Sequence, residues 1–444
     1  MATTAEPSKK YVLDSVLLFS SRSTIPVEIS NNVSDIDIYE HLDCPFLTAQ
    51  IALVDETRLM DRLDIQGAEF VEIKLKPSLT AEPIITKRFV IETILESQKV
   101  NQTAEFLILS LYEDILFKSN YKNVNKVYTG DPIKIISDIA EEFLDKKIAQ
   151  AGDATFQNRM KVIIPNLDPL KAIAWIKNRM TTADGVPDYI FSTLGLDKLI
   201  VNDLVSMIDQ EPINLSKPFM YASTPNVAEE KRIGTNYLPI LSYNEGDREN
   251  MFQLIKSGVV GAQYQFYDAF TSKVSKVNLN YKRDVVDKLP STKEKRYNFA
   301  EYNIDGDILN ELQSQRITQI GSAGVFNNGL GSFKSYNEEK DDTDYSKKVI
   351  GNVLKKHLLK APITIKVSGV GFLKPQTNMT LGNTIRLYFL SNKPAEKTAT
   401  TNWDVKRSGD YLIYATKHSF TTERYDISLT CAKMKNFTSE AAIV

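Results

Sequence analysis

The sequence has few of the residues on which most metal and redox sites depend. Its 444 residues include two cysteines, three histidines and 19 glycines. Cys44 and Cys431 are too few for a disulfide framework or a four-thiolate zinc site. His41, His357 and His418 have no second histidine, cysteine or carboxylate at the spacing of metal ligands. The sequence therefore predicts no metal site and no cofactor.

Motifs of the large enzyme classes are also lacking. The chain contains neither GxSxG nor GxxxxGK[ST], which removes the usual signatures of triad hydrolases and P-loop enzymes. The run GSAGVFNNGLGSF lacks the Lys-Ser/Thr that would follow in a phosphate-binding loop. Glu141 and Glu142 are adjacent on a predicted helix and point in different directions. We expect no catalytic residues and no enzyme.

Charge of one sign is lacking too. With 54 Lys and Arg against 56 Asp and Glu, the formal net charge is -2, which gives no basic field for nucleic acid. No apolar run approaches the roughly 20 residues that span a bilayer, and the first residues lack the order of a signal peptide. The sequence predicts no membrane anchor and synthesis in a cytoplasm.

What the sequence has is apolar and aromatic material for several cores. Hydrophobic residues make up 42% of the chain, with 20 Tyr and 20 Phe, so a mainly disordered chain is excluded. Two helices are predicted, over 131–152 and 166–181. Asp131-Pro132 opens the first run and Asp168-Pro169 lies near the start of the second, and apolar residues at helical spacing follow in both. Alternating apolar residues predict strands on both sides of them.

The fold class that follows is α+β and β-dominated, with two similar antiparallel β-barrel domains, an intervening α/β domain and a charged insertion. The predicted boundaries are 1–126 for the first barrel, 127–215 for the α/β domain, 216–287 with 363–444 for a discontinuous second barrel, and 288–362 for the Gly/Asn-containing insertion with helices.

A repeat supports the two barrels. GAEFVEIKL aligns with GNTIRLYFL, which places Gly67 on Gly382 and Phe70 on Ile385 at an offset of 315 residues. The hairpin that follows aligns with DYLIYATKHSFTTERYDISLTCAKM at offsets of 322 and then 319 residues. A nearly constant offset over three consecutive strands is typical of a duplicated β-domain. Three copies of such a chain present six similar faces, so a threefold object can seat a sixfold ring.

The same segments carry a resemblance to a known family. PFLTAQIALVDETRLMDRLDIQGAEFVEIKL resembles the first barrel of baseplate central hub proteins of contractile-tailed bacteriophages, which are related to the head region of the type VI secretion VgrG spike. LGNTIRLYFLSN, followed by SGDYLIYATKHSFTTERYDISL, resembles the second barrel of that family. The resemblance covers most of the chain. Nothing in the chain resembles a fused OB-fold spike or lysozyme domain.

The resemblance implies a virion structural protein: a homotrimeric hub of pseudo-sixfold symmetry in the tail baseplate, assembled in the host cytoplasm. It would join the sixfold tail tube to the threefold membrane-puncturing spike around an axial channel. The implied partners are the chain itself, the tube protein, a separate central spike protein and other baseplate proteins, with genomic DNA only in passage. Candidate residues for tube attachment or the trimer interface are Leu47, Leu53, Leu59, Leu63, Gly67, Phe70, Gly382, Ile385, Leu387, Tyr411 and Ile413.

Two alternatives of other classes remain open at this point. One is a tail-associated cell-wall (peptidoglycan) hydrolase with residues 127–215 as its working domain. The other is a monomeric adaptor or adhesin built on two barrels. The lack of paired catalytic carboxylates in a recognisable frame disfavours the first, and the mass of the protein in solution separates the second from a trimer.

Overall fold

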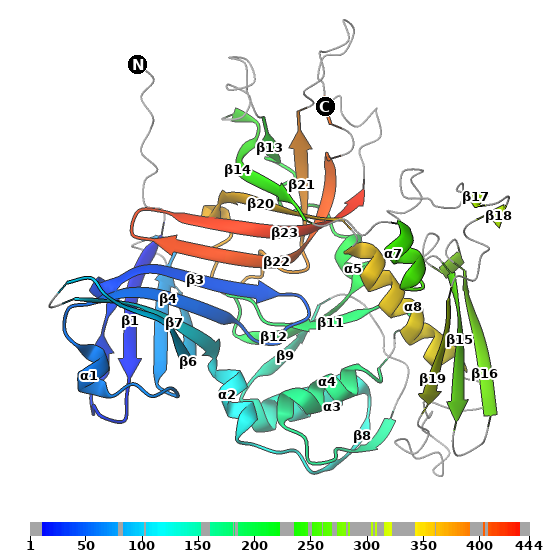
Figure 1. Ribbon diagram of the computed structural model, residues 1–444, viewed down its shortest axis with the longest axis horizontal. Coiled ribbons are helices and arrows are strands. Elements are labelled where there is room, and N and C mark those ends of the chain that lie inside the picture. The colour runs from blue at the N-terminus through cyan, green and yellow to red at the C-terminus, as the bar shows by residue number, and fades with distance from the viewer. Residues whose placement is uncertain are drawn as a thin grey trace, which may run out of the picture.

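A computed structural model gives the fold of most of the chain. It describes residues 11–78, 83–101, 104–151, 160–180, 182, 185–222, 235–246, 251–259, 261–268, 273–280, 283–284, 303–304, 307–308, 315–321, 342–359, 361–390, 403–404 and 407–435. Much of the predicted insertion 288–362, including 322–333 of the glycine-rich run, lies outside the described residues. The fold is β-dominated, as predicted (Figure 1).

The first β unit is a curled sheet of six main strands in the order β1-β5-β6-β7-β4-β3. These strands are β1 (Val12–Phe19), β3 (Val33–His41), β4 (Thr48–Asp55), β5 (Phe70–Lys76), β6 (Ile85–Lys99) and β7 (Glu105–Glu113). Alternating apolar residues give β4 and β5 one buried face each, as period two requires. Among the described residues β1 and β3 are not paired; β2 (Val27–Glu28) and the 3-10 turn η1 (Ser30–Asn32) lie against β1 instead. A short helix, α1 (Leu59–Leu63), connects β4 to β5.

The second β unit is a closed six-stranded barrel. Its order is β13-β21-β22-β23-β20-β14, and the pairing of β14 with β13 closes the ring. The strands are β13 (Phe219–Tyr221), β14 (Leu238–Glu245), β20 (Pro362–Ser368), β21 (Thr384–Phe389), β22 (Gly409–Thr421) and β23 (Tyr425–Lys435). The barrel is mixed rather than wholly antiparallel, because β13 runs parallel to both neighbours.

The two units share one topology. Taken in chain order, the first, fourth, fifth, sixth, third and second strands are neighbours in both sheets. Two of their bulges coincide as well, although each unit also has a bulge that the other lacks, between Ile94 and Glu96 in β6 and between Asp410 and Tyr411 in β22. The second strand has a bulge between Val33 and Asp35 in one unit and between Ile240 and Ser242 in the other. The fifth strand has a bulge directly after Ile91 and directly after Ile413. Shared bulges are unexpected in unrelated sheets, so they support a duplication.

On the fourth and sixth strands, the equivalence between the two units differs by one residue from the alignment read from the sequence. Ala68 donates its N–H to the Ile91 carbonyl, and Gly382 donates in the same way to Ile413. Ala68 is therefore the equivalent of Gly382, with φ angles of 72° and 76°. The true offsets are 314 on the fourth strand and 320 on the sixth. The glycine match was misleading, because the first unit places an alanine where the second has glycine.

In the chain, an α/β unit follows the first β unit and precedes the second; in Figure 1 it lies below both. It contains α2 (Asp114–Asn120), β8 (Val127–Gly130), α3 (Pro132–Leu144), β9 (Lys147–Gln150), β10 (Met160–Ile163), α4 (Pro169–Lys177), β11 (Asp188–Phe191), β12 (Lys198–Asp203) and α5 (Leu204–Ile208). α4 begins as predicted, with the Asp168 side chain accepting from the Lys171 N–H. The helix predicted over 131–152 ends early, because Asp145 turns left-handed and the chain continues as β9 beside β12.

The remaining described elements flank the closed barrel. β15 (Gly261–Asp268), β16 (Lys273–Asn280) and β19 (Gln315–Gly321) form a separate sheet, so the segment 216–287 gives the barrel only β13 and β14. β17 (Asn303–Ile304) pairs with β18 (Asp307–Ile308). Two helices, α7 (Met251–Lys256) and the predicted α8 (Asp342–Leu358), place Leu254 and Leu354 in the core of the second unit.

One ladder joins the two β units. Residues Asp35 to His41 of β3 pair antiparallel with Ala415 to Thr421 of β22, so a single sheet of 13 strands runs through both units. Figure 1 shows β3 and β4 directly beside β22 and β23. The second strand of one unit thus pairs with the fifth strand of the other.

The left-handed residues give a test of the corrected register. A left-handed alanine is strained by about 1–2 kcal/mol, and glycine is not. We expect Ala68→Gly to raise the free energy of unfolding by up to about 1 kcal/mol and Gly382→Ala to lower it by more than about 1 kcal/mol. The added methyl at Gly382 would also meet Met207 Sδ at 2.8 Å. Urea unfolding curves measure both changes.

The control is the same substitution in an ordinary strand. Ala52→Gly in β4 should destabilise by about 0.5–1 kcal/mol, because glycine loses more conformational freedom on folding. A destabilised Ala68→Gly variant, matching Ala52→Gly, would contradict the equivalence of Ala68 and Gly382.

Candidate interaction surfaces

The residues proposed from the sequence for tube attachment or trimer contacts lie mostly inside the chain. At most 5% of the surface of these side chains is exposed: Leu47, Leu53, Leu59, Leu63, Ile385, Leu387, Tyr411 and Ile413. They belong to the cores of the two β units. Gly382 is buried, while Gly67 and Phe70 are half-buried. Phe70 contacts Phe117 edge to face, and the Arg88 guanidinium lies 4.2 Å from its ring centre.

The outer side of the β3–β22 ladder carries a polar cluster. Asp37 accepts a hydrogen bond of 2.7 Å from Ser419 Oγ, and its other oxygen lies 2.8 Å from Lys417 Nζ. The Lys417 ammonium also lies 5.5 Å from the centre of the Tyr39 ring. Partly exposed ion pairs of this kind contribute little stability, about 0–1 kcal/mol, but they fix which residue stands opposite which.

The inner side of the same ladder holds a buried charge. The Glu40 side chain is fully buried and accepts hydrogen bonds from Thr416 Oγ1 and from the Leu194 N–H. His418 Nε2 lies 3.3 Å from Glu40 Oε1, and its Nδ1 lies 2.7 Å from the Tyr425 hydroxyl. Burial pushes the pKa of Glu40 up, but the charge of His418 and the hydrogen bonds outweigh burial and leave that pKa below 4.5.

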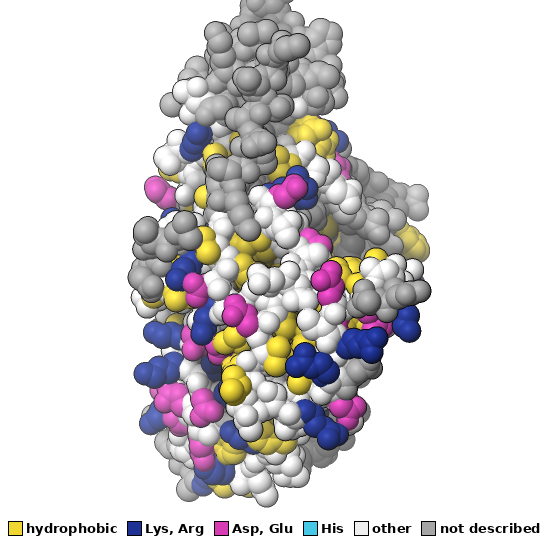
Figure 2. Space-filling view, turned by 90° about the vertical axis from the view of Figure 1, so that its left-hand side faces the viewer, with side chains coloured by type: hydrophobic (Ala, Val, Ile, Leu, Met, Phe, Trp, Pro, Cys, Tyr) yellow, Lys and Arg dark blue, Asp and Glu magenta, His cyan; other side chains and the backbone are white. Residues whose placement is uncertain are grey.

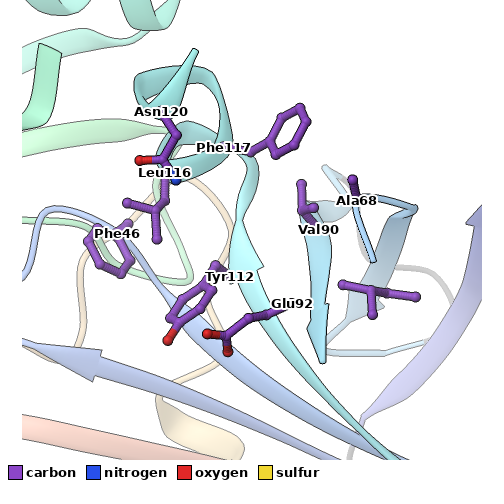
Figure 3. Close-up of a pocket in the computed structure, with 9 residues that line it drawn as sticks. Phe46, Ala68, Val90, Glu92, Tyr112, Leu116, Phe117 and Asn120 are labelled. Atoms are coloured by element: carbon purple, nitrogen blue, oxygen red, sulfur yellow. The ribbon is translucent and has the colours of Figure 1, made fainter. Parts of the chain in front are cut away.

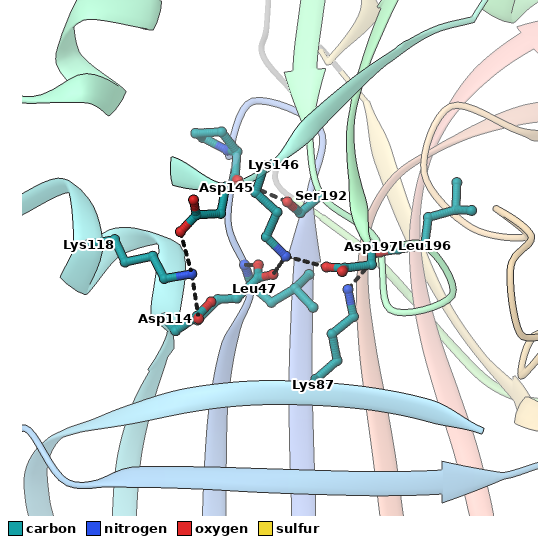
Figure 4. A network of polar contacts seen from close by, with 11 residues as sticks. Leu47, Lys87, Asp114, Lys118, Asp145, Lys146, Ser192, Leu196 and Asp197 are labelled. Carbon is teal, nitrogen blue, oxygen red and sulfur yellow. Dashed lines mark hydrogen bonds and ion pairs between the residues drawn. The ribbon is translucent and has the colours of Figure 1, made fainter. Parts of the chain in front are cut away.

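A second charged network attaches the α/β unit to the first β unit (Figure 4). Glu113, at the end of β7, accepts from the Leu47 N–H at 2.9 Å and lies 3.3 Å from Lys146 Nζ. Lys146 also pairs with Asp197. Burial lowers the pKa of Lys146, but Glu113 and Asp197 outweigh it, and the pKa is raised. Lys87 donates to the Leu196 carbonyl at 2.7 Å. These contacts link β6 and β7 to the loop between β11 and β12.

A recess of about 420 Å³ opens at the end of the first β unit, between β6, β7 and α2 (Figure 3). Its lining is mostly apolar and aromatic, with Glu92 beside Tyr112: Phe46, Ala68, Val90, Ile91, Glu92, Tyr112, Leu116, Phe117 and Asn120. At the equivalent place in the second unit, Met207 of α5 and Phe191 of β11 lie against Gly382. The recess is thus open in the first unit, whereas Met207 and Phe191 occupy the equivalent place in the second.

The exposed face of the first β unit carries no field of one sign. Figure 2 shows Lys and Arg interspersed with Asp and Glu across it, with hydrophobic side chains in small patches between them. Large exposed apolar side chains occur on the outer half of the β6–β7 hairpin, Leu95 at 53% and Val100 at 62%. Others lie on β14, where Leu241 is 50% exposed. Single exposed aliphatic side chains are common on protein surfaces, but these lie on open strand edges, where another strand can pair.

The sequence reasoning missed Glu40 and treated His418 as an ordinary histidine. A signal was present, because Glu40 lies on the same buried face of β3 as Ile36 and Ile38. A buried carboxylate requires a partner.

Within the described residues no group of three or more His, Cys, Asp or Glu could hold a metal ion. In the same part of the chain, no helix is long and apolar enough to cross a membrane.

Substitution of Glu40 tests the importance of the buried pair. Glu40→Gln should destabilise the protein by about 3–5 kcal/mol at neutral pH, since it leaves a buried partner uncompensated. The pKa of Glu40 is lowered on folding, so its contribution is present above pH 4.5 and is lost as the pH falls below that value. The difference in stability between the variant and the native chain should therefore narrow as the pH falls below 4.5, as measured by thermal unfolding across pH 3–7.

Glu56→Gln provides the control, because Glu56 is exposed in a turn beside β4. It should leave both the stability and its pH dependence within about 0.5 kcal/mol of the native chain. An equal loss for Glu40→Gln at every pH would show that the carboxylate acts through packing alone.

Solved structures with a similar fold come from phage tails. The tail protein from Neisseria meningitidis MC58 aligns with a TM-score of 0.53 and 10% identity, over 95% of this chain and 96% of that one. The 43 kDa tail protein of prophage MuSo2 from Shewanella oneidensis aligns with a TM-score of 0.50 and 9% identity, over 94% of this chain and 98% of its own. The E. coli c3393 protein, a component of the type VI secretion system, aligns over 95% of this chain and 77% of its own at 10% identity, with a TM-score of 0.39.

No protein-family model matches the chain. No curated protein matches it either. At identities of about one residue in ten the structural likeness establishes the fold and leaves the function to be argued. The resemblance read from the sequence is confirmed at that level: the chain has the fold of phage tail proteins over nearly its whole length.

Proposed function

We propose that the protein is the structural hub of a phage tail baseplate, a homotrimer of pseudo-sixfold symmetry that joins the tail tube to the central spike around an axial channel. The observation that carries this proposal is the repeated unit: one topology with two matching bulges occurs twice in the chain, and the two units are joined head to tail through β3 and β22. Two similar units per chain become six in a trimer, which matches a sixfold ring to a threefold object.

The repeat also supports the proposed division of the chain. We assign tube attachment to the units formed within 1–126 and within 216–287 with 363–444, and a bracing role to the α/β domain at 127–215. Within these units, the regions around Leu47–Leu75 and Thr384–Ser419 are the proposed attachment regions. Of the candidate residues there, Phe70 and Gly67 retain accessible surface, and the buried ones act by shaping the strands.

The proposed role is non-enzymatic, with the protein located in the virion tail after assembly in the host cytoplasm. Its partners would be itself, the tube protein, the spike protein and other baseplate proteins. Tail proteins are among the structures with a similar fold, which is consistent with a place among tail and spike components. Neighbouring charges of both signs suit specific docking to protein better than binding to nucleic acid.

The oligomeric state and the shape of the assembly test this proposal. Light scattering on the purified chain should give the mass of three chains, and negative-stain electron microscopy of the same sample should show threefold rings with six similar lobes. A monomer that forms no ring, even at high concentration and with the tube protein added, would contradict the hub and favour a two-unit adaptor. Clearing of a peptidoglycan suspension by the purified chain would contradict the non-enzymatic role.

A further inference from the structure

We propose that the trimer closes by repeating between chains the joint that the chain makes within itself. The outer edge of β14, from Ser242 to Glu245, would pair antiparallel in the next copy with residues 97–100, at the end of β6 and directly after it. This inference rests on the proposed trimer and adds the strands, the register and the residues that form its interface.

The equivalence of the strands comes first. β14 is the second strand of its unit, as β3 is. Each has a bulge in its pairing with the third strand, between Ile240 and Ser242 in β14 and between Val33 and Asp35 in β3. β6 is the fifth strand of its unit, as β22 is, and the two share the bulge after Ile91 and Ile413. β6 has a second bulge between Ile94 and Glu96 that β22 lacks, so the equivalent residues beyond it are read from the pairing with the sixth strand. The joint within the chain uses a second strand and a fifth strand, β3 and β22. The chain therefore holds one further pair of the same kind, β14 and β6.

The outer half of β6 is an edge that the chain itself leaves open. β5 pairs with β6 only as far as Val90, and beyond the bulge the residues from Thr93 to Lys99 pair on one side alone, with β7. Among the described residues no other strand lies on their second side. In β22 the equivalent residues are covered by β3 and alternate between buried and half-buried, whereas this part of β6 is almost wholly exposed.

β14 has a matching edge. It pairs with β13 through Leu238 and Pro239 only, and from Ser242 to Asn244 its described ladder partner is β20 on the other side. The corresponding part of β3, from Asp35 to Asp37, belongs to the longer stretch, Asp35 to His41, that pairs with β22. An open β-edge presents unpaired N–H and C=O groups, which a strand of another chain satisfies.

The two edges also fit by chemistry. In the existing joint Ser419 stands opposite Asp37. Their equivalents, read from the pairings with neighbouring strands, are Gln98 and Asn244. Both carboxamides donate and accept, so a Gln98–Asn244 pair replaces the Ser419–Asp37 hydrogen bond.

The neighbouring positions agree with this register. Glu96 takes the place of Lys417, so the carboxylate meets the Asn244 amide in place of the lysine that meets Asp37. Val100, 62% exposed, falls opposite Ser242 and beside Leu241, which is 50% exposed. The pairing brings no like charges face to face and covers two aliphatic side chains that are exposed in the single chain.

The geometry gives a ring. The contact is head to tail, because the two edges come from different units, so it generates a closed ring or a filament but no twofold dimer. The joint within the chain relates the first unit to the second. Repeating that relation from the second unit to the first unit of the next copy places six units around one axis.

A pair of cysteines tests the register directly. In antiparallel pairs, opposite residues have Cα atoms about 4.5–5.5 Å apart, which a disulfide spans. The double variant Gln98→Cys with Asn244→Cys should form covalent dimers and trimers under mild oxidation, seen on a denaturing gel and removed by reduction. Each single variant should remain a monomer on the same gel, because in the ring the two positions meet only each other.

Asp37→Cys with Ser419→Cys is the matched positive control. It places the same disulfide in the joint within the chain and should change the gel mobility of the monomer without adding mass. Light scattering of the native chain separates the two levels of the proposal. A trimer in solution with no cross-link in the double variant overturns this pairing and leaves the hub intact. A native monomer overturns the hub and the pairing together.

Discussion

The ladder between β3 and β22 is the contact on which the rest of the molecule depends. It fuses two duplicated units into one sheet and fixes their rotation relative to each other. Backbone hydrogen bonds set the distance, and the side chains on its two faces set the register. On the inner face Glu40 ties the ladder to His418 and to the Leu194 N–H of the α/β unit. One buried carboxylate thus holds three parts of the chain in place.

The two copies of the unit have diverged where the chain needs them to differ. The second closes into a barrel through β13 and β14, while β1 and β3 of the first are bridged by β2 and η1. In the second, Met207 of α5 packs on Gly382, where the first unit has the open recess beside Ala68. The α/β unit contacts both copies but fills this place only in the second.

The sequence predicted the duplication and the fold class, because period-two patterns and strand order survive when residue identity does not. It matched the fifth strand at the right offset of 322 residues but placed the fourth and sixth strands one residue out of register. A single matched glycine outweighed the apolar pattern, and only the backbone shows that Ala68 adopts the φ angle of Gly382. The candidate site residues were chosen for being apolar, and apolar residues in strands are mostly core. Glu40 carried a better signal, since a carboxylate in the buried register of Ile36 and Ile38 marks a constraint that packing alone does not explain.

Open β-edges need an explanation in a folded protein, because they invite pairing with any chain. Natural edges are usually shortened, charged or covered. The outer half of β6 has charges at Glu96 and Lys99 but also the aliphatic Leu95, and it is long. Such an edge does not lead to aggregation if one specific strand pairs with it in the assembled state and its charged side chains disfavour pairing with other strands. Within the chain, β3 covers this edge of β22, and the proposed pairing between chains would cover the equivalent edge of β6 in the same way.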